Sequence, residues 1–145
     1  PDRYESGTLD VAAIAGLDAS LQWIGERGTG AIHAHTLALA DRLIERTGER
    51  RDIIVRHAPA GPNRTATVSL SFANMDPAVA GRMLDERYGI ACRSGLHCAP
   101  AAHRTLGTFP QGTVRVSFGW FNTNDDVDAL VSALDEFKGD ATQHL

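Results

Sequence analysis

Lysine is almost absent from this chain of 145 residues. Of its 14 lysine and arginine side chains, 13 are arginine, and the single lysine is Lys138. Chemistry that needs a lysine amine in an interior pocket therefore has almost no candidate. Cysteine is scarce too, because only Cys92 and Cys98 are present, too few for a disulfide scaffold. This cysteine usage fits a reducing, cytoplasmic setting.

Long apolar runs and excess positive charge are also missing. No apolar stretch approaches the roughly 18 residues that span a bilayer, and no basic segment followed by an apolar one suggests a secretory signal. A net charge of −4 argues against general nucleic-acid binding, and 43% hydrophobic residues argue against disorder. We expect one globular domain over residues 1–145, with a leading segment at 1–9 and a frayed tail at 139–145, and neither membrane nor nucleic acid as partner.

Hydrophobic periodicity predicts four helices and four strands. Helices are expected after capping residues that precede apolar positions at helical spacing, namely Asp10, Thr29, Asp76 and Thr123. Strands are expected over residues 52–56, 67–72, 90–93 and 113–118, the second and fourth with alternating polar and apolar positions. This order predicts an α+β fold in which a small, mostly antiparallel sheet has helices packed on one face.

Residues 94–112 form a long stretch without regular periodicity, which is typical of a functional loop. It contains Cys98, which follows His97 and lies near Arg93 and Arg104 in the sequence. Positive neighbours stabilise the thiolate form of a cysteine, so Cys98 is a candidate nucleophile. The local sequence leaves open that it is simply a small buried side chain, as most free cysteines are.

Other candidate sites carry weaker signals. The spacing of Cys92, His97, Cys98 and His103 matches no common zinc pattern, so no metal site is expected, and Cys92 is expected to pack in an apolar run.

Two further positions could bind anions. Arg115 lies on the polar face of its expected strand, either solvated or as a bidentate anchor for a carboxylate. Gly7 and Thr8 precede the first expected helix, where a phosphate could bind.

Several of these segments together resemble the class V aminotransferase family, and within it the cysteine desulfurases, which use pyridoxal phosphate (PLP). Residues 90–100 look like the active-cysteine segment of those enzymes. Residues 114–118 and 121–128 resemble the closing strand and helix, and residues 5–8 resemble the start of the C-terminal part. The resemblance runs in the family's order from about Arg3 to Phe137.

The resemblance implies a role for each matched residue. Cys98 would be the nucleophile that takes sulfur from L-cysteine, releases alanine and becomes a persulfide. Arg115 would hold the substrate's α-carboxylate, with Arg93 assisting and His97 lining the site. In the family Gly7 and Thr8 would reach the PLP phosphate of the neighbouring subunit in a homodimer.

The family's PLP-binding lysine lies in a larger upstream domain, within a motif that this sequence does not contain. The resemblance therefore implies the C-terminal small domain of a fold-type I PLP enzyme, which folds but does not catalyse without its N-terminal PLP-binding domain. A sulfur acceptor protein is a further implied partner, although Leu96 stands where some desulfurases carry a second histidine. A selenocysteine lyase, another class V aminotransferase, and a non-catalytic dimerisation or sulfur-carrier module remain alternatives.

Overall fold

The computed structural model describes residues 2–4, 6–59, 61 and 63–140. The chain divides into two compact units, Pro1–Ile32 and His33–Leu145. The prediction of a single domain over the whole chain therefore stays a prediction.

The first unit contains the 3-10 helix η1 (Asp2–Tyr4) and the helix α1 (Val11–Arg27), and its last residues begin α2 (Thr29–Thr47). α1 starts where the sequence predicts it, because the carboxylate of Asp10 accepts a hydrogen bond from the backbone N–H of Ala13 at 3.0 Å. None of the residues of α1 is buried.

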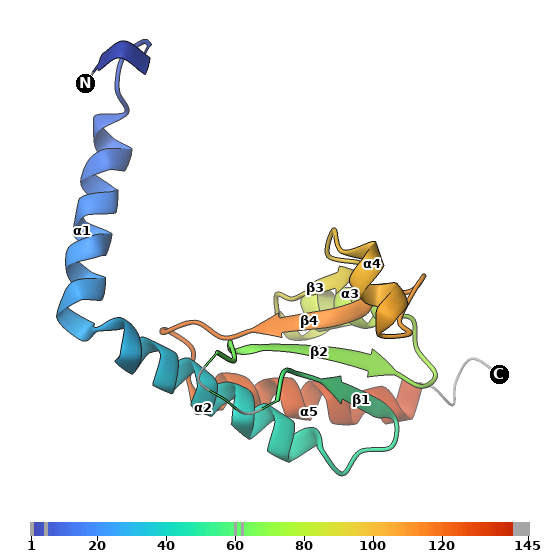
Figure 1. The fold of residues 1–145 in the computed structure, drawn as a ribbon. Helices are drawn as coiled ribbons and strands as arrows, with labels where there is room; N and C mark the ends of the chain where they lie inside the picture. The colour runs from blue at the N-terminus through green and yellow to red at the C-terminus, as the bar shows by residue number, and fades with distance from the viewer. Residues whose placement is uncertain (1, 5, 60, 62, 141–145) are drawn as a thin grey trace. The chain divides into compact units, whose positions relative to one another are not determined.

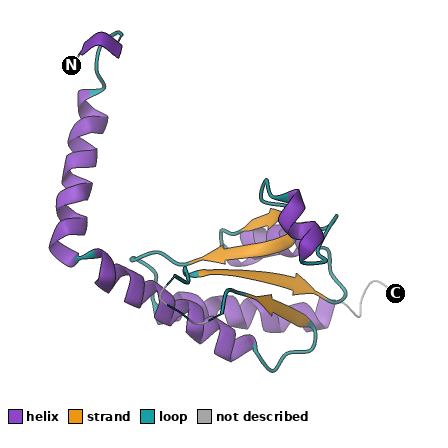
Figure 2. Ribbon diagram, in the orientation of Figure 1, coloured by secondary structure: helices purple, strands orange, loops and turns teal. Residues whose placement is uncertain are grey.

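The second unit is built around a four-stranded sheet (Figures 1 and 2). The strands lie in the order β1-β2-β4-β3, and every neighbouring pair is antiparallel. Its elements in chain order are β1 (Ile53–Arg56), β2 (Thr67–Phe72), α3 (Pro77–Tyr88), β3 (Arg93–Gly95), α4 (Pro100–Thr105), β4 (Thr113–Ser117) and α5 (Asn124–Asp140). This architecture confirms the predicted α+β class. No helix within the described part of the chain has the length and apolar character needed to cross a membrane.

One face of the sheet carries the core. In the register of β2 and β4, Val68 pairs with Val116 and Leu70 with Val114, and all four side chains are buried. α2 and α5 lie side by side along this face (Figure 1), where Leu43 and Leu134 are fully buried. The alternation that predicted a half-buried strand at 67–72 is therefore confirmed.

The third strand lies later in the chain than the sequence-based expectation. The strand expected over 90–93 is instead β3, Arg93–Gly95. The backbone N–H of Ile90 bonds to the carbonyl of Leu84 at 2.9 Å, and Gly89 has a left-handed φ of 64°, so this segment caps α3 instead of joining the sheet.

The stretch 94–112 is also more regular than predicted, because it holds most of β3 and the short helix α4. α4 has only six residues, too few to produce a helical periodicity that a sequence pattern can reveal. At the end of the chain, residues 139 and 140 belong to α5 and not to a frayed tail, whereas 141–145 lie outside the described residues.

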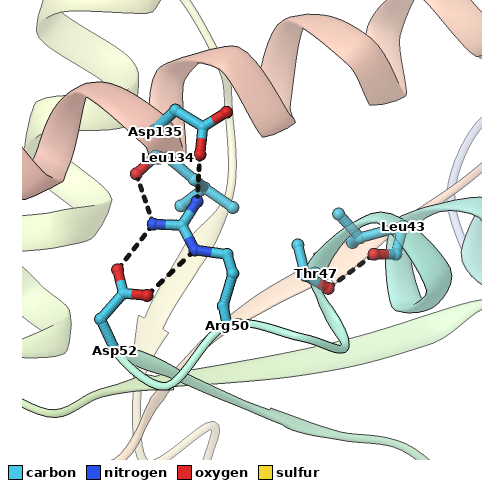
Figure 3. A network of polar contacts seen from close by, with 6 residues as sticks. All are labelled: Leu43, Thr47, Arg50, Asp52, Leu134 and Asp135. Carbon is cyan, nitrogen blue, oxygen red and sulfur yellow. Dashed lines mark hydrogen bonds and ion pairs between the residues drawn. The ribbon is translucent and has the colours of Figure 1, made fainter.

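Arg50 joins the turn between α2 and β1 to α5 at the end of the core (Figure 3). Its guanidinium donates to both carboxylate oxygens of Asp52, to Asp135 at 2.9 Å and to the carbonyl of Leu134 at 2.9 Å. The Arg50 side chain is only 8% exposed. A planar cation that satisfies several acceptors in one buried position fixes the α2–β1 turn against α5.

Replacing Arg50 with lysine tests this arrangement. Lysine keeps the charge but cannot direct donors to all of these acceptors at once. We expect Arg50→Lys to lower the free energy of unfolding by about 1–3 kcal/mol, measured by urea denaturation. Arg51→Lys, at the exposed neighbouring position, is the matched control and should change stability by less than about 0.5 kcal/mol. Equal effects of the two substitutions would contradict the assignment.

Candidate functional site

Two arginines stand opposite each other on the face of the sheet that points away from the core. Arg93 of β3 is the register partner of Arg115 of β4, and directly paired residues point to the same face. Within the described residues, neither arginine forms an ion pair with a carboxylate. Like charges at directly opposed positions destabilise a sheet, and a bound carboxylate would relieve that repulsion.

The candidate nucleophile lies on a tight turn next to these arginines. The backbone N–H of Ala99 bonds to the carbonyl of Leu96 at 2.8 Å, so His97 and Cys98 are the two central residues of the turn. Their φ angles are 52° and 60°, in the left-handed region that favours glycine and asparagine. Holding non-glycine residues in such a conformation costs about 1–3 kcal/mol each. The Cys98 side chain on this turn is exposed.

Arg93 connects the turn to the sheet. Its Nη2 donates a hydrogen bond to the Sγ of Cys98 at 3.5 Å. This contact places the Arg93 guanidinium directly beside the sulfur atom. The structure therefore brings together three predicted site residues, Cys98, Arg93 and Arg115.

A pair of histidines lies under the turn. His97 Nε2 is 3.2 Å from the hydroxyl of Thr113, and His103 Nδ1 is 2.7 Å from the hydroxyl of Thr108. The two imidazole centroids are 5.6 Å apart. Thr108 and Thr113 are both buried, so their hydroxyls hold the two histidine rings in fixed orientations.

The electrostatic surroundings of His97 keep its ring neutral near pH 7. Burial lowers the pKa of His97, and the nearby positive charge of Arg115 lowers it further. Its Nδ1 is buried and has no hydrogen-bond partner among the described residues. A neutral imidazole at this position can accept a proton.

Cys92 differs from Cys98 in its exposure to solvent. It is half-buried and packs against the core, as the sequence predicted. Burial raises the pKa of the Cys92 thiol, and the negative charge of Asp85 raises it further. Cys92 is therefore held as a protonated, structural thiol.

Gly7 and Thr8 belong to the first unit of the chain, whereas Cys98 and Arg115 belong to the second. Both residues are exposed, and Gly7 has a φ of 91°, which suits glycine. The Asp10 carboxylate already accepts a hydrogen bond from one backbone N–H of the first turn of α1, that of Ala13. The proposed phosphate contact of Gly7 and Thr8 stays a prediction, and Glu5 of the same segment lies outside the described residues.

Comparison with known proteins gives the chain a family. The family model described as Aminotransferase class-V matches residues 1–130. The chain belongs to the class V aminotransferase family.

Several relatives within that family are named cysteine desulfurases. A probable cysteine desulfurase of Methanothermobacter thermautotrophicus is 33% identical over 140 residues, covering 96% of this chain and 34% of the relative. Cysteine desulfurase CsdA of Escherichia coli is 34% identical over 139 residues, covering 93% of this chain and 32% of the relative. The chain thus spans about a third of the length of these relatives.

Solved structures show the same fold. The S-sulfonic acid form of Escherichia coli CsdA superposes with a TM-score of 0.80 and 31% identity, covering 96% of this chain and 33% of that one. The apo cysteine desulfurase of Thermococcus onnurineus NA1 gives 0.84 and 29%, covering 96% of this chain and 34% of that one. The class V fold is therefore shown for nearly the whole chain.

The residues of this class V chain fit one part of a PLP enzyme and not another. Arg93 and Arg115, which have no carboxylate partner among the described residues, fit the binding of an amino acid. The only lysine of the sequence, Lys138, belongs to α5, which packs on the apolar face of the sheet. The helix that carries it therefore lies on the other side of the sheet from Arg115, so the residues beside Cys98 include no lysine for covalent attachment of PLP. Within the described residues, no group of three His, Cys, Asp or Glu side chains is arranged to hold a metal.

The sequence-based interpretation missed the residues that support the turn. The sequence suggests His103 only as a metal ligand, whereas in the structure its ring bonds to the Thr108 hydroxyl and lies 5.6 Å from the ring of His97. Thr113 shares the polar face of its strand with Arg115, and this alternation is the one signal that could have placed it beside the site.

Gly112 offers a test of how the site is held together. It has a φ of 81°, and a Cβ atom there would overlap the backbone carbonyl of Gly95 in β3. We expect Gly112→Ala to lower the free energy of unfolding by about 2–4 kcal/mol, because backbone strain and a backbone clash combine. Gly107→Ala is the control, since Gly107 has a φ of 68° with open space around it, and it should cost about 1 kcal/mol. Chemical denaturation measures both, and an equal loss would disprove the proposed close approach of Gly95.

The pKa of His97 can be measured by NMR titration of the imidazole signals. We expect it below the ordinary value of 6.5, and Arg115→Gln should raise it only part of the way, because burial is the larger cause. The unfolded chain binds this proton more tightly, so His97 should lower stability as pH falls below about 6.5, and not at higher pH. Arg104→Gln is the control and should leave this pKa unchanged; an equal shift would mean that the effect is unspecific.

Proposed function

We propose that this chain is the C-terminal part of a PLP-dependent cysteine desulfurase, in which Cys98 accepts the sulfur atom of L-cysteine. The observation that carries the proposal is the exposed Cys98 thiol on a strained turn, 3.5 Å from Arg93 Nη2. The named relatives support it, since they are cysteine desulfurases. The upstream PLP-binding domain would come from the two thirds of the relatives' length that this chain does not match.

The arginines would position the substrate. Arg115 and Arg93 present two cations on a rigid strand pair, which suits a planar α-carboxylate. With its carboxylate held there, an amino acid lies beside the turn that carries Cys98. PLP, when bound, supplies an electron sink for amino-acid chemistry.

The sulfur transfer balances without any outside oxidant. The C–S bond of cysteine breaks, an S–S bond forms on Cys98, and alanine is released. The hydrogen that the Cys98 thiol gives up accounts for the hydrogen that the new methyl group gains. His97, neutral near pH 7, would carry a proton in this exchange.

The persulfide would then pass to an acceptor. A persulfide on cysteine is a reversible modification, and the exposure of Cys98 would let an acceptor protein reach it. Both cysteines are free thiols, which is consistent with a reducing, cytoplasmic compartment.

The homodimer also belongs to this proposal. α1 presents apolar side chains that are all exposed by more than a third: Val11, Ile14, Leu17, Leu21 and Ile24. A helix with such a face normally buries it against another surface. In the complete enzyme, Gly7 and Thr8 just before α1 would reach the PLP phosphate of the neighbouring subunit.

The decisive test uses the full-length protein that carries this chain. We expect PLP-dependent release of alanine from L-cysteine, and Cys98→Ser should reduce it by at least about 100-fold, because the sulfur acceptor is lost. Mass spectrometry should find one extra sulfur atom on Cys98 of the active enzyme. Cys92→Ser is the matched control and should retain activity.

Other outcomes would redirect the proposal. Full activity of Cys98→Ser would remove Cys98 as the acceptor and favour another class V reaction. A strong preference for selenocysteine would identify a selenocysteine lyase. The 145-residue chain by itself should release no alanine, and PLP-dependent alanine formation by it would contradict the need for an upstream lysine.

A further inference from the structure

A pocket lies on the same face of the sheet as Arg115 but apart from Cys98. It has a volume of about 440 Å³, and neither Cys98, Arg93 nor Arg115 lines it. It lies at the β1 edge, between β1, the end of β2 and the segment 107–112. Nothing in the proposed desulfurase reaction uses this pocket.

The strand register places a third arginine there. Arg56 of β1 pairs with Ser69 of β2, and Ser69 pairs with Arg115 of β4, so the three side chains share one face. Because neighbouring strands lie about 4.8 Å apart, the Cα atoms of Arg56 and Arg115 are separated by roughly 10 Å. Ser71 lies on the same face and also lines the pocket.

Two buried polar atoms in this pocket have no partner. Arg56 Nε and Ser71 Oγ are both buried, and neither forms a hydrogen bond within the described residues. Buried polar atoms without a partner are rare in folded proteins. Both atoms can donate a hydrogen bond, so the ligand that would satisfy them must bring acceptor oxygens.

The other polar groups of the pocket do not replace such a ligand. Asp76 lines it, but its Oδ1 accepts from the backbone N–H of Ala78 at 2.7 Å as the cap of α3. The Thr108 hydroxyl is engaged with His103. The remaining lining includes one further polar residue, Gln111, and the apolar residues Ile54 and Met75.

We propose that this pocket binds a short aliphatic carboxylate. The planar carboxylate would accept from Arg56 Nε and the Ser71 hydroxyl, and the aliphatic chain would contact Ile54 and Met75. The volume is in the range of small-molecule sites. The proposal concerns a binding site only and does not depend on sulfur chemistry at Cys98.

NMR of the ¹⁵N-labelled 145-residue chain tests the site, with sodium butyrate as the probe and sodium chloride at equal ionic strength as the reference. We expect the Arg56 Nε–H signal to shift and saturate with butyrate, and more weakly with acetate or inorganic phosphate. Arg56→Lys should weaken butyrate binding by about tenfold, and Ser71→Ala by about threefold. Arg82→Lys, an exposed position on α3, is the charge-matched control and should bind like the wild type.

The result is distinguishable from failure of the desulfurase proposal. Arg115→Gln should leave the butyrate-dependent shift of the Arg56 Nε–H signal intact, since Arg115 does not line the pocket. Unchanged binding in both Arg56→Lys and Ser71→Ala, or equal shifts with chloride, would overturn the site as adventitious ion binding only. Calorimetry on the full-length protein with the Arg115→Gln substitution completes the test: butyrate binding that Arg56→Lys weakens supports the site. Its absence would mean that another part of the protein fills the pocket, which overturns a small-ligand role.

Discussion

The antiparallel pairing of β2 with β4 is the constraint on which the rest of the second unit depends. Its register puts Leu70 beside Val114 on one face and Ser69 beside Arg115 on the other. A shift by one residue would exchange the faces, burying the arginine and exposing the core. Because α2 and α5 must cover the apolar face, the polar face is left available for binding.

The site places unfavourable features together on a stable support. Arg93 faces Arg115 across the strands, and His97 and Cys98 both have left-handed backbone conformations. Each arrangement costs free energy that the core and contacts such as those of Arg50 must offset. Strain of this kind is common at functional sites, where it presents a reactive group in a fixed position.

The predicted site residues of the second unit and the helix that carries the only lysine of the sequence lie on opposite faces of the sheet. The Cys98 thiol, the facing arginines Arg93 and Arg115, and His97 all lie on one turn and one strand pair. The single lysine belongs to a helix on the other side of the sheet. This division agrees with a chain that spans about a third of its desulfurase relatives.

Much of this could be predicted from residue order, because helix caps and strand alternation are local. The Asp10 and Asp76 caps, the strand at 67–72 and the α+β class are confirmed, and the strand expected over 113–118 is observed as β4, which ends one residue earlier. The sequence also selected Cys98 and Arg115, whose functional roles stay proposals.

The tertiary structure decided what depends on distant partners. The Ile90 N–H bonds to the Leu84 carbonyl, so residues 90–92 cap α3 and β3 begins only at Arg93. His103 bonds to Thr108, and its ring lies next to that of His97. Arg56 lies on the same face of the sheet as Arg115 because Arg56 pairs with Ser69 and Ser69 pairs with Arg115. Local periodicity determines which side a residue faces, whereas hydrogen bonds between separate segments determine what it meets there.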